Sequence, residues 1–313
     1  MRRRVFWGAS LALAGCHRTP DPEWLAAPTA TEDVTITWDG ASVPGTLPAA
    51  AESGGVWSLY FIGLEGSIQG SLLATSEDGL AFTLSSSHRV NDALVEDADD
   101  AALGNAVYDS GSTIHLISTA VHGGTTGIWH GEATDGETFT WGKKALWESS
   151  DGPSAATGAL FEPGLAMVAL QTETSGGDPA VSVATSEDGG DTWTEPAAAW
   201  APDDIPTPWG STTVGAGGVW AATIVPGWEQ GYHMLYLGAG PNGKTPLGIG
   251  QAWSDDGLTW VGTGELWYAA PEGVVLDGLS VLKAEDTLWV YVSGTPAGGD
   301  PVEDGGFFRL QVP

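Results

Sequence analysis

Hydrophobic residues along this chain occur mostly in short runs in which apolar and polar positions alternate. The clearest example is Val34–Trp38, where valine, isoleucine and tryptophan alternate with threonines. Comparable runs recur up to the C-terminus, for instance Val56–Ile62 and Thr287–Val292, and they are separated by segments rich in glycine, proline and aspartate. A period of two residues indicates β-strands, and long helix-forming runs are almost absent. The pattern therefore predicts an all-β fold built from many short strands.

A repeated turn divides these strands into groups. Four aspartate–glycine turns, with glycines at Gly79, Gly136, Gly189 and Gly257, each follow one strand-like run and precede another. The aspartate accepts backbone N–H groups of a tight hairpin, and glycine takes positive φ without a Cβ clash. The sequence therefore predicts one such hairpin in each of four similar units. The residues that we assign to these turns are Asp78, Gly79, Asp135, Gly136, Ser186, Asp188, Gly190, Trp193, Ser254, Asp256, Gly257 and Trp260.

Two of the turns resemble a motif of a known fold. Ser186 to Trp193 matches the Asp-box pattern S-x-D-x-G-x-T-W of sialidases and related propellers at every specified position. Ser254 to Trp260 is similar to the shortened form found in five-bladed glycosidases of the arabinanase, levansucrase and invertase type, and the strand, loop and strand before it support the likeness. The resemblance covers most of Val34–Pro313 and implies a five-bladed β-propeller with these turns at its rim.

The strand count explains how the ring would close. The last group has strands at Leu279–Lys283, Thr287–Val292 and Gly306–Val312 and lacks an aspartate–glycine hairpin. The run over residues 34–38 has no local partner. We therefore predict that this N-terminal strand pairs into the last blade, which protects edges that would otherwise invite aggregation. The first blade is expected to begin with the strand at Val56–Ile62.

The resemblance also implies where catalytic acids would lie. Propeller glycosidases carry them at the start of the innermost strands, often in a phrase like D-P-S-V, and their reaction takes at least two carboxylates. Asp277-Gly-Leu-Ser-Val281 is the one stretch that fits, so Asp277 is our catalytic candidate, with all other catalytic positions unknown. The corresponding stretches, which have no acid at the matching place, are Gly104–Val107, Gly158–Phe161 and Val219–Ala222. Acids in loop-like segments are Glu148, Asp151, Glu162 and Glu229.

Tryptophan supplies a second line of evidence for a ligand. Half of the 16 tryptophans lie between Trp193 and Trp267. Exposed indoles stack on the C–H faces of pyranose rings, whereas buried ones wedge between blades. Our candidates for stacking on a sugar are Trp209, Trp220 and Trp228.

Metal ligands do not stand out in the sequence. The six histidines show no close metal-ligand spacing, so we expect surface or packed residues and no metal centre. The acidic run Glu96–Asp100 could hold calcium, but it lacks the glycine that bends a calcium loop at its sixth position. A solvated acidic loop is the simpler interpretation, and we expect no cofactor.

The first residues resemble the signal of a bacterial lipoprotein. Met1–Arg4 is cationic, Val5–Gly15 is apolar but too short to span about 30 Å of hydrocarbon, and residues 13–16 (Leu-Ala-Gly-Cys) resemble a lipobox. The resemblance implies cleavage before Cys16 and acylation of its thiol, and His17 in place of aspartate favours the outer membrane. We therefore expect a signal peptide over 1–15, an acylated cysteine and flexible tether over 16–32, and a single propeller domain over 33–313.

Charge narrows the choice of partner. Forty acidic residues against ten basic ones give a formal net charge of −30, which argues against nucleic acid. We expect a monomer in the bacterial cell envelope, held to the membrane by lipid on Cys16, that binds glycan or serves as an interaction scaffold without catalysis. One alternative is an active glycoside hydrolase of the arabinanase or sialidase-like propeller type. Another is a purely structural platform for protein partners.

Overall fold

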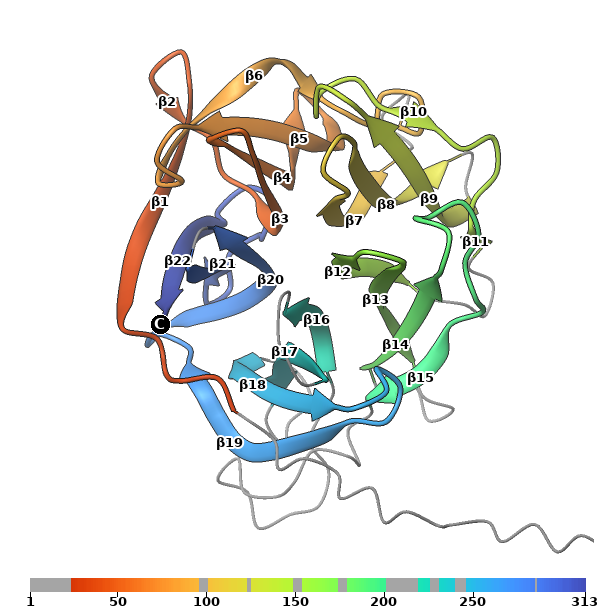
Figure 1. Cartoon of the computed structure of the whole chain (residues 1–313). Helices are drawn as coiled ribbons and strands as arrows, with labels where there is room; N and C mark the ends of the chain where they lie inside the picture. Colours follow the sequence, from red (N-terminus) through yellow and green to blue (C-terminus); the bar gives the residue numbers. More distant parts are fainter. Residues whose placement is uncertain are drawn as a thin grey trace, which may run out of the picture.

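The computed structural model describes residues 24–95, 101–122, 125–148, 154–173, 179–200, 219–225, 231–239, 246–284 and 286–313. Every regular element in this part of the chain is a β-strand, and the strands form a ring of five blades around a central axis (Figure 1). Several residues singled out above lie outside the described part: Cys16, the run 96–100, Asp151, Trp209, Trp228, Glu229 and the side chain of Trp220.

Each blade is an antiparallel sheet whose first strand lies nearest the axis (Figure 1). The first blade contains β3 (Thr46–Ser53), β4 (Val56–Glu65), β5 (Ile68–Ser76) and β6 (Ala81–Arg89). The second contains β7 (Ala101–Asp109), β8 (Ile114–His122) and β9 (Thr125–Ala133), with β10 (Thr140–Trp141) and β11 (Trp147–Glu148) on its outer edge. The third contains β12 (Ala155–Glu162), β13 (Leu165–Glu173), β14 (Pro179–Ser186) and β15 (Ala197–Trp200).

The last two blades complete the ring. The fourth contains β16 (Val219–Val225), β17 (Tyr232–Ala239), β18 (Pro246–Ser254) and β19 (Val261–Ala269). The fifth contains β20 (Val274–Ala284), β21 (Thr287–Pro296), β22 (Gly306–Val312) and the N-terminal strand β1 (Ala30–Trp38), beside which β2 (Ala41–Ser42) forms a short ladder. The five-bladed propeller predicted from the sequence is therefore confirmed. Apolar clusters fill the seams between blades, as where Leu237 of the fourth blade packs with Leu279 and Val290 of the fifth.

The innermost strand of the first blade corrects the sequence analysis, which began that blade at Val56. The structure places β3 ahead of it, with the sequence Thr-Leu-Pro-Ala-Ala-Ala-Glu-Ser. Most of β3 is buried on both faces, so it shows no alternation of apolar and polar residues. Small side chains suit this position because five strands converge on the axis there.

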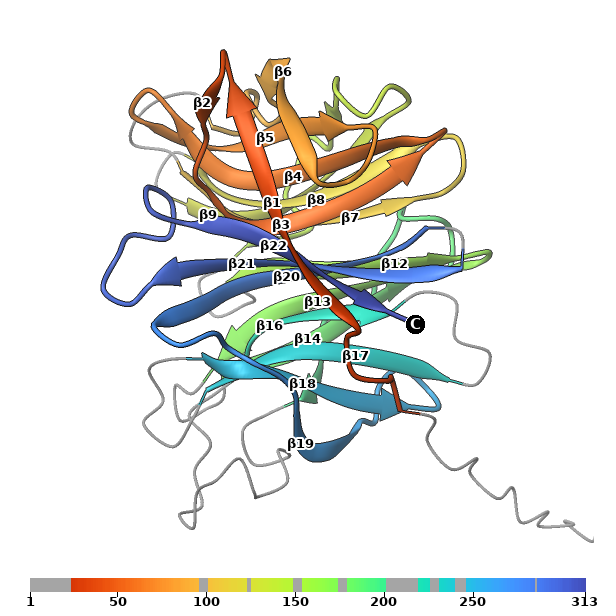
Figure 2. The same cartoon turned by 90° about the vertical axis from the view of Figure 1, so that its left-hand side faces the viewer.

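Ring closure by the N-terminal strand is confirmed, with different bounds. Residues Ala30–Val34 of β1 pair antiparallel with β22, so that Val34 faces Phe307. Residues Thr35–Thr37 then leave the fifth blade and pair parallel with β6 of the first. Figure 2 shows β1 crossing from one blade to the other. One strand therefore joins both neighbours of the closing seam, and it begins four residues earlier than the alternation indicated.

Arg309 of β22 reinforces this closure. Its Nε donates to Glu32 Oε2 of β1 at 2.8 Å, and its Nη1 donates to the Asp78 carbonyl in the first blade's turn at 2.9 Å. The guanidinium also lies over the Trp289 ring, 4.0 Å from its centroid. Because the arginine side chain is only 7% exposed, these contacts act with little competition from water.

The aspartate–glycine turns have the bonding expected of their residues. In the turn after β14, Asp188 Oδ1 accepts the Thr192 N–H at 2.9 Å, and Ser186 Oγ accepts the Gly190 N–H at 2.8 Å. Bonds from the Thr192 hydroxyl, its N–H and Ser186 lower the pKa of Asp188 to about 2. Gly189 has a φ of +83°, a conformation that a Cβ would strain.

These turns also join one blade to the next. Three tyrosines donate their hydroxyl protons to a glycine carbonyl in the neighbouring blade's turn. The pairs are Tyr60 with Gly136 (2.7 Å), Tyr108 with Gly189 (3.0 Å) and Tyr291 with Gly79 (2.8 Å). The turns at the rim therefore hold the seams together.

The residues just before β1 belong to the folded body. Leu25 is 4% exposed, and its N–H donates to Gln251 Oε1 at 3.0 Å. The Ala26 carbonyl accepts the Trp267 Nε1–H at 2.8 Å. Part of the segment expected to be a tether thus packs on the fourth blade, because it carries apolar residues that reach the seam. Among the described residues, no helix has the length and apolar character needed to cross a membrane.

Candidate functional site

The innermost strands share an irregularity at one end. Each of β3, β7, β12, β16 and β20 has a shift in its pairing register within its first half. A β-bulge of this kind turns one residue out of the ladder and re-aims its side chain, which is why bulges are common beside functional sites. The residues at the five bulges are Leu47 with Pro48, Leu103, Thr157, Trp220 and Asp277.

Close packing of the inner strands explains the glycine that follows three of these bulges. A Cβ on Gly158 would lie 2.5 Å from Thr223 Cα in the next blade, and one on Gly278 would lie 2.7 Å from Leu47 Cα. Since real Cβ atoms do not approach so closely, only glycine lets these inner strands meet. The bulge residues are thereby held at corresponding places around the axis.

Asp277, the catalytic candidate, occupies the bulge of β20. Its carboxyl is half-buried, and burial raises its pKa to about 6, against the opposing effect of a hydrogen bond that Thr295 donates to Oδ2. A carboxyl that stays partly protonated near neutral pH can act as a general acid. Asp277 therefore has the raised pKa that a general acid requires.

The other bulge positions do not supply the second half. Thr157 uses its hydroxyl within the seam, where it donates to the Ala222 carbonyl at 2.9 Å and accepts the Ala222 N–H at 3.2 Å. Leu103 and Leu47 have no ionisable group, and Trp220 stands at the fourth position. Among the five described bulges, Asp277 is thus the single carboxylate, as the comparison of inner-strand sequences indicated.

The opposite ends of the inner strands enclose a small cavity of about 170 Å³. Two acids line it, and each accepts a hydrogen bond from the backbone of a nearby turn. Glu52 Oε1 accepts the Gly55 N–H, and Asp109 Oδ1 accepts the Gly111 N–H. Ligand pockets for drug-sized molecules run to about 300–1,000 Å³. These acids therefore shape turns, and the cavity is small for an oligosaccharide.

One group of chemistry-bearing side chains escaped the sequence analysis, which weighed the histidines by their spacing along the chain. The β8–β9 hairpin pairs His115 with Glu132 and Ile117 with His130, so that three residues up to 17 positions apart converge. The signal that could have revealed them is the register of β8 on β9, which sets His115 opposite Glu132 and one diagonal step from His130. The loop acids Glu148 and Glu162 lie on β11 and β12, and no described contact brings them to Asp277.

Comparison with known proteins supports the architecture. The sequence matches no protein-family model and no curated protein. In structure it is similar to a thermostable family-43 glycoside hydrolase, with a TM-score of 0.63 and 15% identity over 89% of this chain and 91% of the other. It is also similar to a β-1,2-mannobiose phosphorylase from Listeria innocua solved with β-1,2-mannobiose, with a TM-score of 0.59 and 14% identity over 86% and 90% of the two chains.

A third similar structure has another activity. It is an N-acetylgalactosamine deacetylase from F. plautii solved with blood group B trisaccharide, with a TM-score of 0.60 and 12% identity over 92% and 94% of the two chains. At these identities the likeness shows a shared fold, that of five-bladed glycoside hydrolases and phosphorylases. Activity has to be argued from this chain's own site.

Proposed function

We propose that this chain is a glycan-binding propeller that has lost, or never had, glycoside hydrolysis, carried on an envelope lipoprotein acylated at Cys16. The observation that carries the proposal is the set of bulge residues, in which Asp277 is the only carboxylate among the five described bulges. Glycoside hydrolysis takes an acid and a second carboxylate about 5–10 Å apart across the sugar. One acid alone binds a hydroxyl well but does not complete that pair.

Carbohydrate is the ligand class that the fold and the residues favour together. The similar structures include proteins solved with β-1,2-mannobiose and with a trisaccharide. In this chain Trp220 occupies the bulge of β16, the position that Asp277 holds in β20. We propose that the indole of Trp220 and the carboxyl of Asp277 act together on a sugar, since an indole stacks on C–H groups and a carboxyl bonds hydroxyls. Trp209 and Trp228 are the further stacking candidates.

An active glycoside hydrolase is the second candidate. The observation that favours it is the pKa of Asp277, which burial raises to about 6. In that case the second carboxylate comes from a position other than the bulges.

A glycan array and a panel of chromogenic glycosides on the purified protein separate these functions. We expect glycan binding without turnover, a loss of affinity of at least about tenfold in Trp220→Ala, and retained binding in Trp38→Ala, a matched change at an indole that is 39% exposed on β1. Turnover that Asp277→Asn abolishes would instead establish the hydrolase. If the protein neither binds nor hydrolyses any glycan, both functions are refuted and a scaffold for protein partners remains.

The membrane anchor is tested separately. Metabolic labelling with a radioactive fatty acid should mark the wild-type chain and should leave Cys16→Ala unlabelled. Fractionation of the labelled cells then reports whether the outer membrane, which His17 favours, holds the protein. A mature chain that still carries residues 1–15 would contradict the proposed processing.

A further inference from the structure

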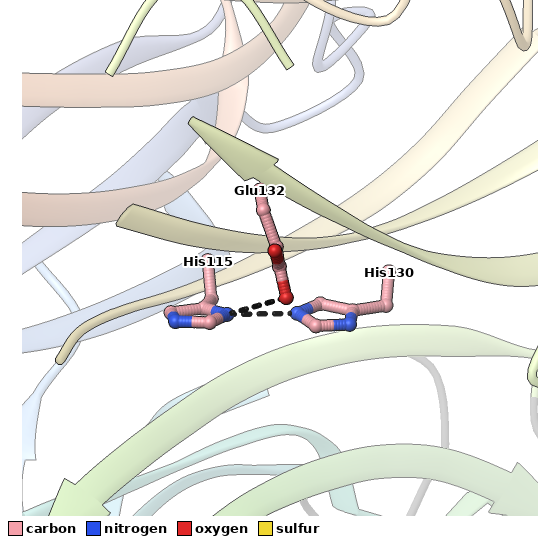
Figure 3. Close-up of side chains that lie close together, drawn as sticks. All are labelled: His115, His130 and Glu132. Carbon is pink, nitrogen blue, oxygen red and sulfur yellow. Dashed lines mark hydrogen bonds and ion pairs between the residues drawn. The ribbon is translucent and has the colours of Figure 1, made fainter. Parts of the chain in front are cut away.

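The second blade carries a compact group of nitrogen and oxygen ligands, formed by His115 of β8 with His130 and Glu132 of β9 (Figure 3). His115 Nδ1 lies 2.9 Å from His130 Nε2 and 3.8 Å from Glu132 Oε1. The two imidazoles lie side by side with nearly parallel planes, 9° apart, and their nitrogens face each other with the carboxylate beside them. The group is separate from the bulge residues discussed above.

Ser110 determines which nitrogen of His115 carries the proton. Its hydroxyl donates to the Thr113 carbonyl at 3.2 Å, and its oxygen lies 3.0 Å from His115 Nε2. Because a serine hydroxyl has one proton, its oxygen is left to accept from Nε2–H. His115 Nδ1 then presents a lone pair towards His130 and Glu132. A second hydrogen bond of this kind is what orients a histidine ligand in metal sites.

Packing holds His115 in this orientation. The residue is 6% exposed, and its ring stacks on that of Tyr108 with centroids 4.4 Å apart and planes 8° apart. Tyr108 is itself fixed, because its hydroxyl donates to Gly189 and its other neighbour is the parallel ring of Phe161. At least one ligand is therefore preorganised, and a ligand that need not be ordered costs less on binding.

The distances fit a metal ion closely. Tetrahedral zinc with Zn–N bonds of about 2.0–2.1 Å separates two nitrogens by about 3.3 Å. The observed 2.9 Å between nitrogens and 3.8 Å to the carboxylate each differ from that by about half an ångström. Glu132 is 48% exposed, so its side chain can move by this amount and water can complete the coordination.

Charge suits the same ion. The Glu132 carboxylate supplies negative charge beside the two imidazoles. Asp191 and Asp109 add negative potential at His115.

We propose that His115, His130 and Glu132 form a binding site for a first-row divalent transition metal ion, with Zn²⁺ the ion that two imidazoles, one carboxylate and an open water position fit best. The ion links β8 to β9 at the seam with the third blade's turn. Since the ligands converge only in the folded chain, binding stabilises that blade.

Zinc titration of the chelator-treated, purified protein tests the site. We expect one Zn²⁺ per chain by calorimetry, a rise in melting temperature on adding Zn²⁺, and no displacement by excess Ca²⁺, which prefers an all-oxygen shell. His130→Gln and Glu132→Gln should each weaken binding by at least about tenfold. The matched control is Glu148→Gln, an equal charge change at an exposed acid in the same blade, which should bind as the wild type does.

Visible absorption of bound Co²⁺ is a second readout of the site, which is useful if His130→Gln folds poorly. Co²⁺ in a site with two imidazole nitrogens absorbs visible light, and this band should appear in the wild type and in Glu148→Gln and be absent from His130→Gln. Glu132→Gln alters an exposed side chain and tests the site without disturbing the core. Binding that is absent from the folded wild type, or that is equal in wild type, His130→Gln and Glu132→Gln, would overturn the proposal and leave a hydrogen-bonded histidine pair.

Discussion

Replacing Arg309 by alanine tests whether the closing seam holds the propeller together. The change removes the bond to the Asp78 carbonyl, the ion pair with Glu32 and the contact with the Trp289 ring. A hydrogen bond from a charged group contributes about 1.5–3 kcal/mol, and a desolvated cation–π contact contributes about 1–2 kcal/mol. The Glu32 carboxylate is 39% exposed, so its pairing adds about 0.5–1 kcal/mol.

These contributions share one side chain and are not additive, so we expect Arg309→Ala to lower the free energy of unfolding by about 3–5 kcal/mol. For a chain of this size the melting temperature should fall by about 6–10 °C. Urea denaturation followed by tryptophan fluorescence measures the loss, and calorimetry measures the melting temperature.

Two further variants make the test specific. Glu32→Gln should cost about 1 kcal/mol at most, because it leaves the buried contacts in place. The loss of unfolding free energy in Arg309→Lys should lie between those of Arg309→Ala and Glu32→Gln, since an ammonium cannot make both hydrogen bonds and also cover the Trp289 ring. A loss below about 1 kcal/mol in Arg309→Ala, or an equal loss in Glu32→Gln, would refute the view that the buried guanidinium secures the closure.

Two other variants test the inner strands. Gly158→Ala places a Cβ 2.5 Å from Thr223 Cα, so we expect urea denaturation to show a loss of at least about 2 kcal/mol in the free energy of unfolding. Gly306→Ala, whose Cβ has nothing within 4 Å, should change this free energy little. Equal losses in the two variants would contradict the close approach of the inner strands. Burial raises the pKa of Asp277 from 3.8 to about 6, so the stability linked to this carboxyl is present below pH 4 and is lost as the pH rises through about 6. Asp277→Asn should therefore raise the melting temperature at pH 8 relative to wild type but not at pH 4, and a constant difference between those pH values would disprove the assignment.

Local chemistry explains what the sequence could predict. The turn at Asp188 is recognisable because its bonds join residues at most four apart, and the regular recurrence of such turns indicates a repeated blade. Asp277 could be found because the resemblance specifies a phrase at the start of inner strands. Strand β1 showed itself through the alternation over Val34–Trp38, although its first residues, Ala30–Asp33, are mostly polar and lie on the edge of the last blade.

What could not be predicted depends on how neighbouring strands pair and pack. Strand β3 has no alternation, because both of its faces are buried, and alanine-rich segments carry little strand preference. The bulge at Thr157 is a one-residue shift in the pairing of β12 with β13, so neither strand sequence alone reveals it. The approach of His115 to His130 needs the register of β8 on β9, and a shift of one residue would have sent the two rings to opposite faces.

The double pairing of β1 also dictates an order of assembly. The half of β1 that pairs with β6 finds its partner as soon as the first blade has been synthesised. The half that pairs with β22 waits for residues 306–312, which are synthesised only after the inner strands of all five blades. A product cut short by a premature stop would keep free N–H and C=O groups on both sides of the gap, and such open edges invite aggregation. Synthesis as far as β22 is thus a condition for closing the ring, and a copy that stops before it stays open.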